Sequence, residues 1–192
     1  MNAAELKIAD PKRFDKEYYE WLRYALDYNW SEGVTDMFKE DCGPKGVWVQ
    51  NIHFALPGLA GFTGRVDVAV FMELSGLAER YPALYLAVKD DGSWSHVTCT
   101  RNNNVSVSYD SYANQTGPSG LFAGLDQQAW EELIESQEAE ADLEAAMQKY
   151  CNDLSNELYT SLCEDEEYLT SEAAYLDHCE ANDITFELTE EE

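Results

Sequence analysis

The first hydrophobic pattern in the chain has helical spacing. Asp10-Pro11 suits an N-cap followed by the first helical position, and an aromatic stripe then predicts an amphipathic helix over residues 11–28. The stripe consists of Phe14, Tyr18, Trp21, Ala25 and Tyr28. Residues 30–42 are expected to form a loop with one short helical turn. The turn sequence at residues 43–46, Gly-Pro-Lys-Gly, ends this segment.

Strand-like patterns follow the turn and predict a small antiparallel sheet. The strands are expected over residues 47–56, 60–66, 93–100 and 104–109. Asn102-Asn103 favours a tight hairpin between the last two strands, because asparagine tolerates positive φ. Asp67 is expected to cap a helix that lies between the two strand pairs. Its apolar positions are Phe71, Leu74, Leu77, Ala78 and Tyr81.

The pattern becomes helical again from residue 126, and neither proline nor glycine occurs between residues 126 and 169. Apolar residues recur there in steps of three and four, which predicts one long helix or two with a break near 137–141. They are Trp130, Leu133, Ile134, Leu143, Met147, Tyr150, Cys151, Leu154, Leu158 and Leu162. Thr170 or Ser171 is expected to cap a last helix, and residues 183–188 are expected to form a short closing strand.

Together these elements predict an α+β fold, in which helices flank a small antiparallel sheet and the C-terminal region is helical and acidic. The polar loop at residues 113–120 is the expected boundary between two parts. Residues 1–120 would form the α+β core domain. Residues 121–192 would form an acidic helical region that packs on the core or extends from it. The long apolar stripe could serve a homodimer as well as a core.

The charge is distributed unevenly along the chain. The 192 residues carry a net charge of −26, from 38 acidic and 12 basic residues. Residues 126–192 hold 22 acidic residues and one basic residue, Lys149, whereas residues 1–125 hold 16 acidic and 11 basic residues. A salt-adapted protein would be acidic throughout, so the asymmetry argues against that explanation. Phosphates and anionic membranes would repel this chain, which favours a basic protein partner over direct binding to nucleic acid or membrane.

Two carboxylate clusters are the candidate partner-binding site. Glu131, Glu132, Glu135, Glu138 and Asp142 form the first, and Glu164, Asp165, Glu166 and Glu167 form the second. Helical steps of three and four residues advance about 4.5–6 Å. Phosphates along one DNA strand recur at about 6–7 Å, and both strands together give one charge per about 1.7 Å of axis, so a helix with carboxylates at such steps can approximate a phosphate track. The alternative is a solvated helix face that only keeps the protein soluble.

The sequence gives little support for catalysis. It contains no GxSxG, P-loop or GxGxxG motif, and Gly58, Gly61 and Gly64 suit an irregular strand better than a phosphate cradle. We therefore expect a non-enzymatic protein with no catalytic residue, cofactor or metal. A metal-dependent hydrolase built on His53 and His96 is a remote alternative. The five scattered cysteines indicate reduced thiols, and neither a signal peptide nor a membrane span is recognised, so a cytoplasmic location is expected.

Two stretches of the chain are distinctive. The first is the phrase EYLTS-E…EAN…F within residues 158–187, and the second is Phe62-Thr63-Gly64-Arg65-Val66-Asp67. Together they resemble a family of small bacteriophage and plasmid accessory proteins. Members are described as antitoxin-like or anti-restriction-like, and by composition alone the chain is also similar to phage DNA-mimic inhibitors. The family's Trp-x-x-Gly-Asp-Gly stretch is replaced here by Leu56 to Gly61.

The resemblance and the charge together lead to one functional expectation and one alternative. The expected function is a phage-encoded inhibitor that mimics DNA and acts in the bacterial cytoplasm. Its target would be a basic host protein that binds DNA, such as a restriction enzyme or a CRISPR nuclease complex. The alternative is an antitoxin or regulatory partner that neutralises one basic protein.

Overall fold

A computed structural model gives the fold, which is α+β as the sequence predicts. The structure describes residues 1–27, 29–82, 85–86, 89, 94–100, 104–108, 126–128 and 138–187. The chain forms two compact units: a terminal unit of Met1–Gly33 with Ser161–Glu192, and a central unit of Val34–Thr160. This division differs from the expected boundary near residue 120, because the two ends of the chain fold together.

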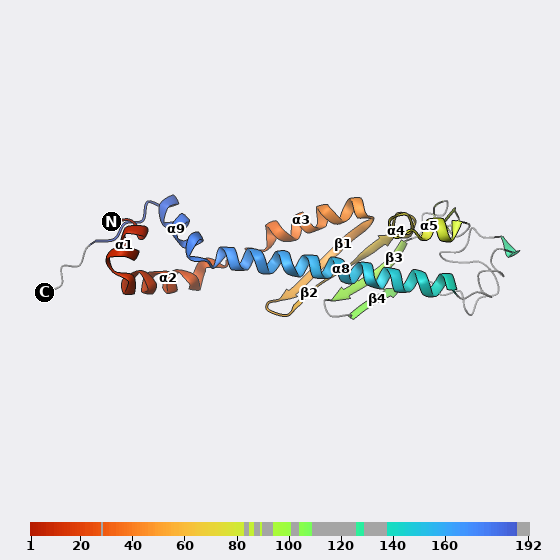
Figure 1. Cartoon of the computed structure of the whole chain (residues 1–192), viewed down its shortest axis with the longest axis horizontal. Coiled ribbons are helices and arrows are strands. Elements are labelled where there is room, and N and C mark those ends of the chain that lie inside the picture. Colours follow the sequence, from red (N-terminus) through yellow and green to blue (C-terminus); the bar gives the residue numbers. More distant parts are fainter. Residues whose placement is uncertain are drawn as a thin grey trace. The chain divides into compact units, whose positions relative to one another are not determined.

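The terminal unit is built from capped helices (Figure 1). Helix α1 (Ala3–Ala9) begins with a capping box, in which Asn2 Oδ1 accepts a hydrogen bond from the Glu5 amide at 2.8 Å. Helix α2 (Pro11–Ala25) starts after Asp10 and has proline in its first turn, as predicted. Helix α9 (Glu172–Ala181) is capped by Ser171, whose Oγ accepts from the Ala174 amide at 3.1 Å. The pattern of residues 1–9 was not recognised in the sequence as a helix.

The core of the terminal unit joins segments from opposite ends of the sequence. Its buried residues are Ala3, Leu6, Phe14, Tyr175 and Cys179. The backbones of Met1 and Phe186 pair, with the Phe186 amide 2.8 Å from the Met1 carbonyl. The predicted closing strand over 183–188 is wrong for the described residues 183–187, which form a turn and then irregular backbone.

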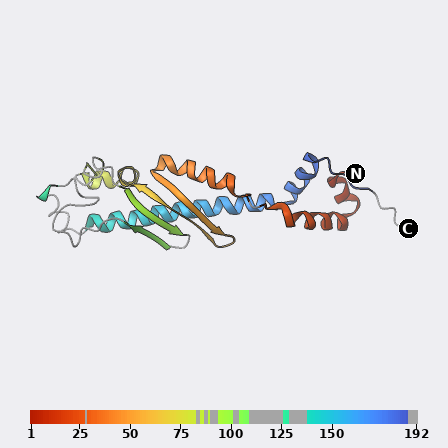
Figure 2. The same cartoon turned by 180° about the vertical axis from the view of Figure 1, so that it is seen from behind.

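The central unit contains a sheet whose strands match the predicted segments closely (Figure 2). The strands are β1 (Val47–Ala55), β2 (Leu59–Asp67), β3 (Trp94–Thr100) and β4 (Asn104–Ser108). Among the described residues they form one antiparallel sheet in the order β1-β2-β3-β4. The predicted Asn102-Asn103 hairpin lies outside the described residues.

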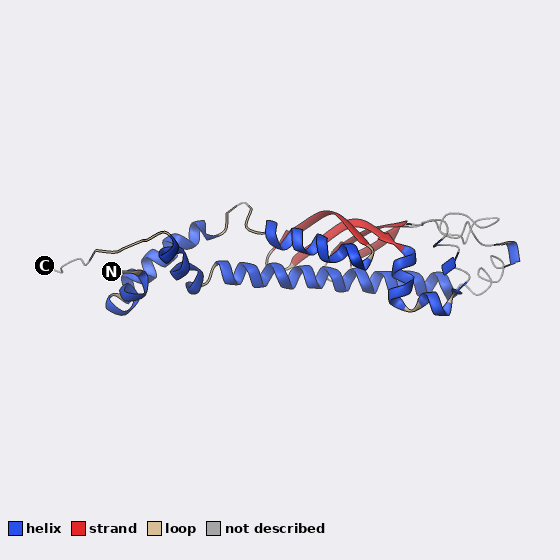
Figure 3. Cartoon of the chain, turned by 90° about the horizontal axis from the view of Figure 1, so that it is seen from above, coloured by secondary structure: helices blue, strands red, loops and turns tan. Residues whose placement is uncertain are grey.

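Helices α3 (Glu32–Cys42) and α8 (Glu138–Leu169) lie on the same side of the sheet (Figure 3). Phe38 of α3 packs its ring 5.6 Å from that of Phe62, and the buried Ser155 hydroxyl of α8 donates to the Ala60 carbonyl at 2.9 Å. Helix α8 buries positions spaced by three or four residues, as its apolar stripe predicts: Leu143, Met147, Cys151, Leu154, Leu158 and Leu162. The expectation of a loop over 30–42 is wrong, because residues 32–42 form a full helix.

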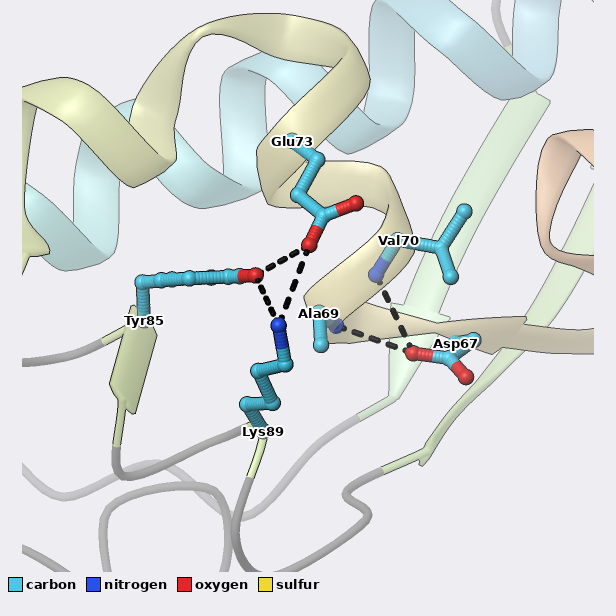
Figure 4. A network of polar contacts seen from close by, with 6 residues as sticks. All are labelled: Asp67, Ala69, Val70, Glu73, Tyr85 and Lys89. Atoms are coloured by element: carbon cyan, nitrogen blue, oxygen red, sulfur yellow. Dashed lines mark hydrogen bonds and ion pairs between the residues drawn. The ribbon is translucent and has the colours of Figure 1, made fainter.

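Asp67 caps helix α4 (Val68–Ser75) as predicted. Its carboxylate accepts from the Ala69 and Val70 amides at 3.0 and 3.2 Å (Figure 4). The predicted single helix through Tyr81 is instead two helices, because Gly76 adopts a left-handed φ of 77° and separates α4 from α5 (Leu77–Arg80).

Candidate functional site

Asp142 is the one residue of the first predicted carboxylate cluster whose side chain the structure describes. Glu131, Glu132 and Glu135 lie outside the described residues, and Glu138 is the first residue of α8. Asp142 is paired within the central unit. Its carboxylate lies 2.5 Å from the Arg80 guanidinium and accepts a hydrogen bond from the Tyr81 hydroxyl at 2.8 Å. A partner would have to displace these contacts to use Asp142.

Other carboxylates of the central unit also have partners in their own chain. Glu157 lies 3.1 Å from Lys45, and Glu73 lies 3.7 Å from Lys89 while accepting a hydrogen bond from the Tyr85 hydroxyl (Figure 4). These are exposed ion pairs, each worth about 0–1 kcal/mol, yet each lowers the local negative potential. These carboxylates thus have cationic partners, although the central unit as a whole still holds 19 acidic and seven basic residues, a net of −12.

The second predicted cluster is different. Glu164, Asp165, Glu166 and Glu167 occupy the last two turns of α8, within the terminal unit. Glu164 and Glu167 are exposed, and the other two are partly buried. Across the described residues, no ion pair involves any of the four side chains. The last turn of α8 contains no basic residue, so the carboxylates there oppose the helix dipole.

The few cations of the terminal unit do little to offset this charge. Its two segments hold 19 acidic and five basic residues, a net of −14, and the segment 161–192 has no basic residue at all. Lys7 pairs with Glu172 and also lies 5.7 Å from the Phe14 ring centre. Arg13 donates to the Glu187 carbonyl at 2.6 Å. Two of the five cations are thus engaged by the unit itself.

A hollow of about 260 Å³ opens on the terminal unit. One face of α2 supplies Glu17, Glu20, Trp21 and Tyr24, whose spacing places them together. The other side comes from α9 and the segment after it: Tyr175, His178, Cys179, Ile184 and Phe186. The hollow therefore combines aromatic rings with two carboxylates, and we call it the aromatic hollow.

The floor of the aromatic hollow is a packed cluster of rings. Tyr175 is buried, with its ring centre 5.3 Å from that of Trp21 and 5.5 Å from that of Phe14. The Tyr18 hydroxyl donates to the Thr170 carbonyl at 2.6 Å and ties α2 to the turn before α9. This packing holds the walls of the hollow in place without a ligand.

The negative field of Glu17 reaches the floor of the hollow. Burial is the main cause that raises the pKa of both Tyr175 and Cys179, and the Glu17 carboxylate raises the pKa of each further. A second hollow of about 340 Å³ lies nearby and is lined by Asn2, Ala3, Ala4, Leu176, Cys179, Glu180, Asp183, Ile184 and Thr185. It has acidic groups but no aromatic ring among these residues.

The two histidines considered as a metal site lie far apart in the sheet. His53 pairs with Gly61 and His96 with Arg65, on opposite neighbours of β2, which puts the two histidines roughly 16 Å apart from strand geometry. No group of three metal-ligating side chains occurs among the described residues. Burial raises the pKa of the Cys42 thiol to about 11 and that of Cys151 to about 12, so both stay protonated at neutral pH.

Sequence reasoning identified the second carboxylate cluster but missed the aromatic hollow. Trp21 was recognised as part of a core stripe, and the spacing of Glu17, Glu20 and Tyr24 around it was the available signal. The partner wall at Tyr175 and Phe186 is set by tertiary packing and has no local signal.

Searches of known protein-family models, curated proteins and solved structures found no match to this chain. Within the described residues, no helix is both long enough and apolar enough to cross a membrane. The charge and geometry of the chain itself are therefore the available guide to its function.

Proposed function

We propose that this chain is a protein-binding inhibitor, whose acidic terminal unit occupies the DNA-binding face of a basic protein. The observation that carries the proposal is the charge of residues 161–192, where twelve acidic residues occur with no basic one. A solvated face usually mixes signs, and concentrated like charge costs stability through self-repulsion. A basic partner offsets that cost when it binds.

The placement of residues 164–167 supports the same conclusion. Acidic side chains favour helix N-termini, whereas these four lie at the C-terminal end of α8. Glu164 and Glu167 are exposed and lie on one side of the helix, roughly 4.5 Å apart along its axis. Phosphate charges along a DNA duplex are spaced at intervals of the same order.

The experiment is displacement of DNA from basic proteins. A fluorescently labelled duplex is bound to a purified restriction enzyme, a CRISPR nuclease complex and a histone-like protein, and fluorescence anisotropy follows its release by the chain. The test variant is Glu164→Gln/Asp165→Asn/Glu166→Gln/Glu167→Gln. The control removes four exposed charges from the central unit through Glu40→Gln/Asp41→Asn/Glu144→Gln/Asp153→Asn.

We expect the wild-type chain to displace DNA from at least one of these proteins, with an affinity that falls as salt rises. The affinity of the 164–167 variant for the basic protein should fall roughly tenfold or more, and that of the control variant should fall less than threefold. Equal losses in the two variants would place the binding site elsewhere. Absence of displacement from every protein at low salt would reject DNA mimicry, and a tight complex that leaves bound DNA in place would favour the antitoxin alternative.

A further inference from the structure

The aromatic hollow has the composition of a site for one cationic side chain. Its lining includes the aromatic residues Trp21, Tyr24 and Phe186 together with Glu17 and Glu20. Aromatic rings attract cations through their quadrupole, and Trp and Tyr do so best. Carboxylates in the lining add charge complementarity. Within the described part of the chain, neither lysine nor arginine lines the hollow.

The size of the hollow also selects its occupant. Its volume of about 260 Å³ lies below the range of roughly 300–1,000 Å³ that is typical for drug-sized ligands. A single long side chain is of a suitable size. Anionic groups such as phosphates would meet two carboxylates and the net charge of −14 on the terminal unit. A cation is thus the occupant that the electrostatics permit.

The site is already formed before a ligand arrives. Tyr24 is 79% exposed, so its ring is accessible, whereas Tyr175 beneath it is buried and fixed against Trp21. A preformed site loses little entropy when its ligand is ordered.

We propose that the aromatic hollow binds an arginine side chain of the basic partner, an inference that rests on the proposed function. Arginine is favoured over lysine because the planar guanidinium stacks on aromatic faces and also donates paired hydrogen bonds to a carboxylate. The unpaired carboxylates at 164–167 supply long-range attraction, and the hollow supplies a short-range contact that selects the side chain. Recognition then has two separable parts.

The probe for the hollow is a capped octapeptide of alternating arginine and glycine, with matched lysine, citrulline and trimethyllysine peptides. Binding to the full chain is measured by calorimetry at physiological salt. The test variant is Tyr24→Ala, and Tyr19→Ala is its control, because both tyrosines are exposed on α2 and only Tyr24 lines the hollow. Glu17→Gln/Glu20→Gln is compared with the control pair Asp15→Asn/Asp177→Asn, whose exposed carboxylates lie outside the hollow.

We expect the arginine peptide to bind more tightly than the lysine peptide, and the citrulline peptide to bind least. Tyr24→Ala should weaken arginine-peptide binding roughly three- to tenfold, and Tyr19→Ala by less than twofold. The Glu17/Glu20 variant should lose more affinity for the arginine peptide than its control does. Tyr24→Ala should also reduce the ratio of arginine-peptide affinity to lysine-peptide affinity. Losses matched between each variant and its control would overturn the inference, as would tightest binding of the trimethyllysine peptide.

The outcomes separate this inference from the proposed function. If the hollow variants keep the wild-type affinity for the arginine peptide and the chain still displaces DNA, the arginine site is wrong and the inhibitor function stands. If the hollow variants lose arginine binding but the chain displaces no DNA, the arginine site stands and the DNA-mimic function is wrong.

Discussion

Neutralising the four carboxylates at the end of α8 should stabilise the folded chain even as it weakens binding. Glu166 and Glu167 lie in the last helical turn, where each negative charge opposes the helix dipole by about 0.3–1 kcal/mol. Glu164 and Glu167 are also like charges at a spacing of three residues, which costs a few tenths of a kcal/mol. The described structure gives these side chains no ion pair that would be lost.

We therefore expect Glu164→Gln/Asp165→Asn/Glu166→Gln/Glu167→Gln to gain about 1–2 kcal/mol of unfolding free energy. With a urea m-value of about 2 kcal/mol/M, the midpoint should rise by roughly 0.5–1 M. The gain should shrink in high salt, which screens exposed charges. Urea unfolding followed by circular dichroism at two salt concentrations measures it. An unchanged or lower midpoint would mean that the carboxylates make stabilising contacts, and the argument for a binding role would lose its basis.

Two further predictions concern the central unit. Gly64→Ala should lower the unfolding free energy by roughly 2–4 kcal/mol, because a Cβ there would lie 2.3 Å from the Trp48 carbonyl oxygen. The control Gly43→Ala, whose Cβ meets nothing within 4 Å, should lower it by less than about 1 kcal/mol. Equal urea midpoints for the two variants would show that β1 moves aside. Stability should also fall as pH rises from about 9 towards 12. Burial raises the folded pKa of Cys42 to about 11 and of Cys151 to about 12, from 9.0, so the unfolded chain loses these protons first. Urea midpoints at pH 8.5 and 10.5 measure the fall, which should be shallower in Cys42→Ala/Cys151→Ala; an equally steep fall would contradict the assignment.

The elements with strong local signals could be predicted from sequence. The stripe from Leu143 to Leu162 has a helical period and is buried in the structure. Asp67 precedes an apolar helical segment and caps it through two amide hydrogen bonds. Helix α3 was missed, because Gly33, Thr35 and two aspartates weaken its helix propensity. Its helical state is supported by tertiary packing, in which Phe38 contacts Phe62 of the sheet.

The candidate site was only half predictable for a related reason. The 164–167 cluster is local, so the sequence alone locates it at the end of a helix. The aromatic hollow needs Trp21 beside Tyr175, and these residues are brought together only when the two ends of the chain fold as one unit. The boundary near residue 120 was expected from the local polar loop at 113–120. The observed division differs from it because the two ends of the chain fold as one unit.

The difference between paired and unpaired carboxylates favours the proposed binding role over solubility alone. In the central unit, Asp142 and Glu157 lie beside cations of their own chain, which lowers the local negative potential. In the terminal unit, residues 164–167 lack such partners in the described structure and stand where the helix dipole disfavours them. Solubility alone would be served by mixed charges placed without that cost. The aromatic hollow, with Glu17 and Glu20 in its lining, belongs to the same unit as this surplus charge. Attraction and selection on one unit are what recognition of a basic protein requires.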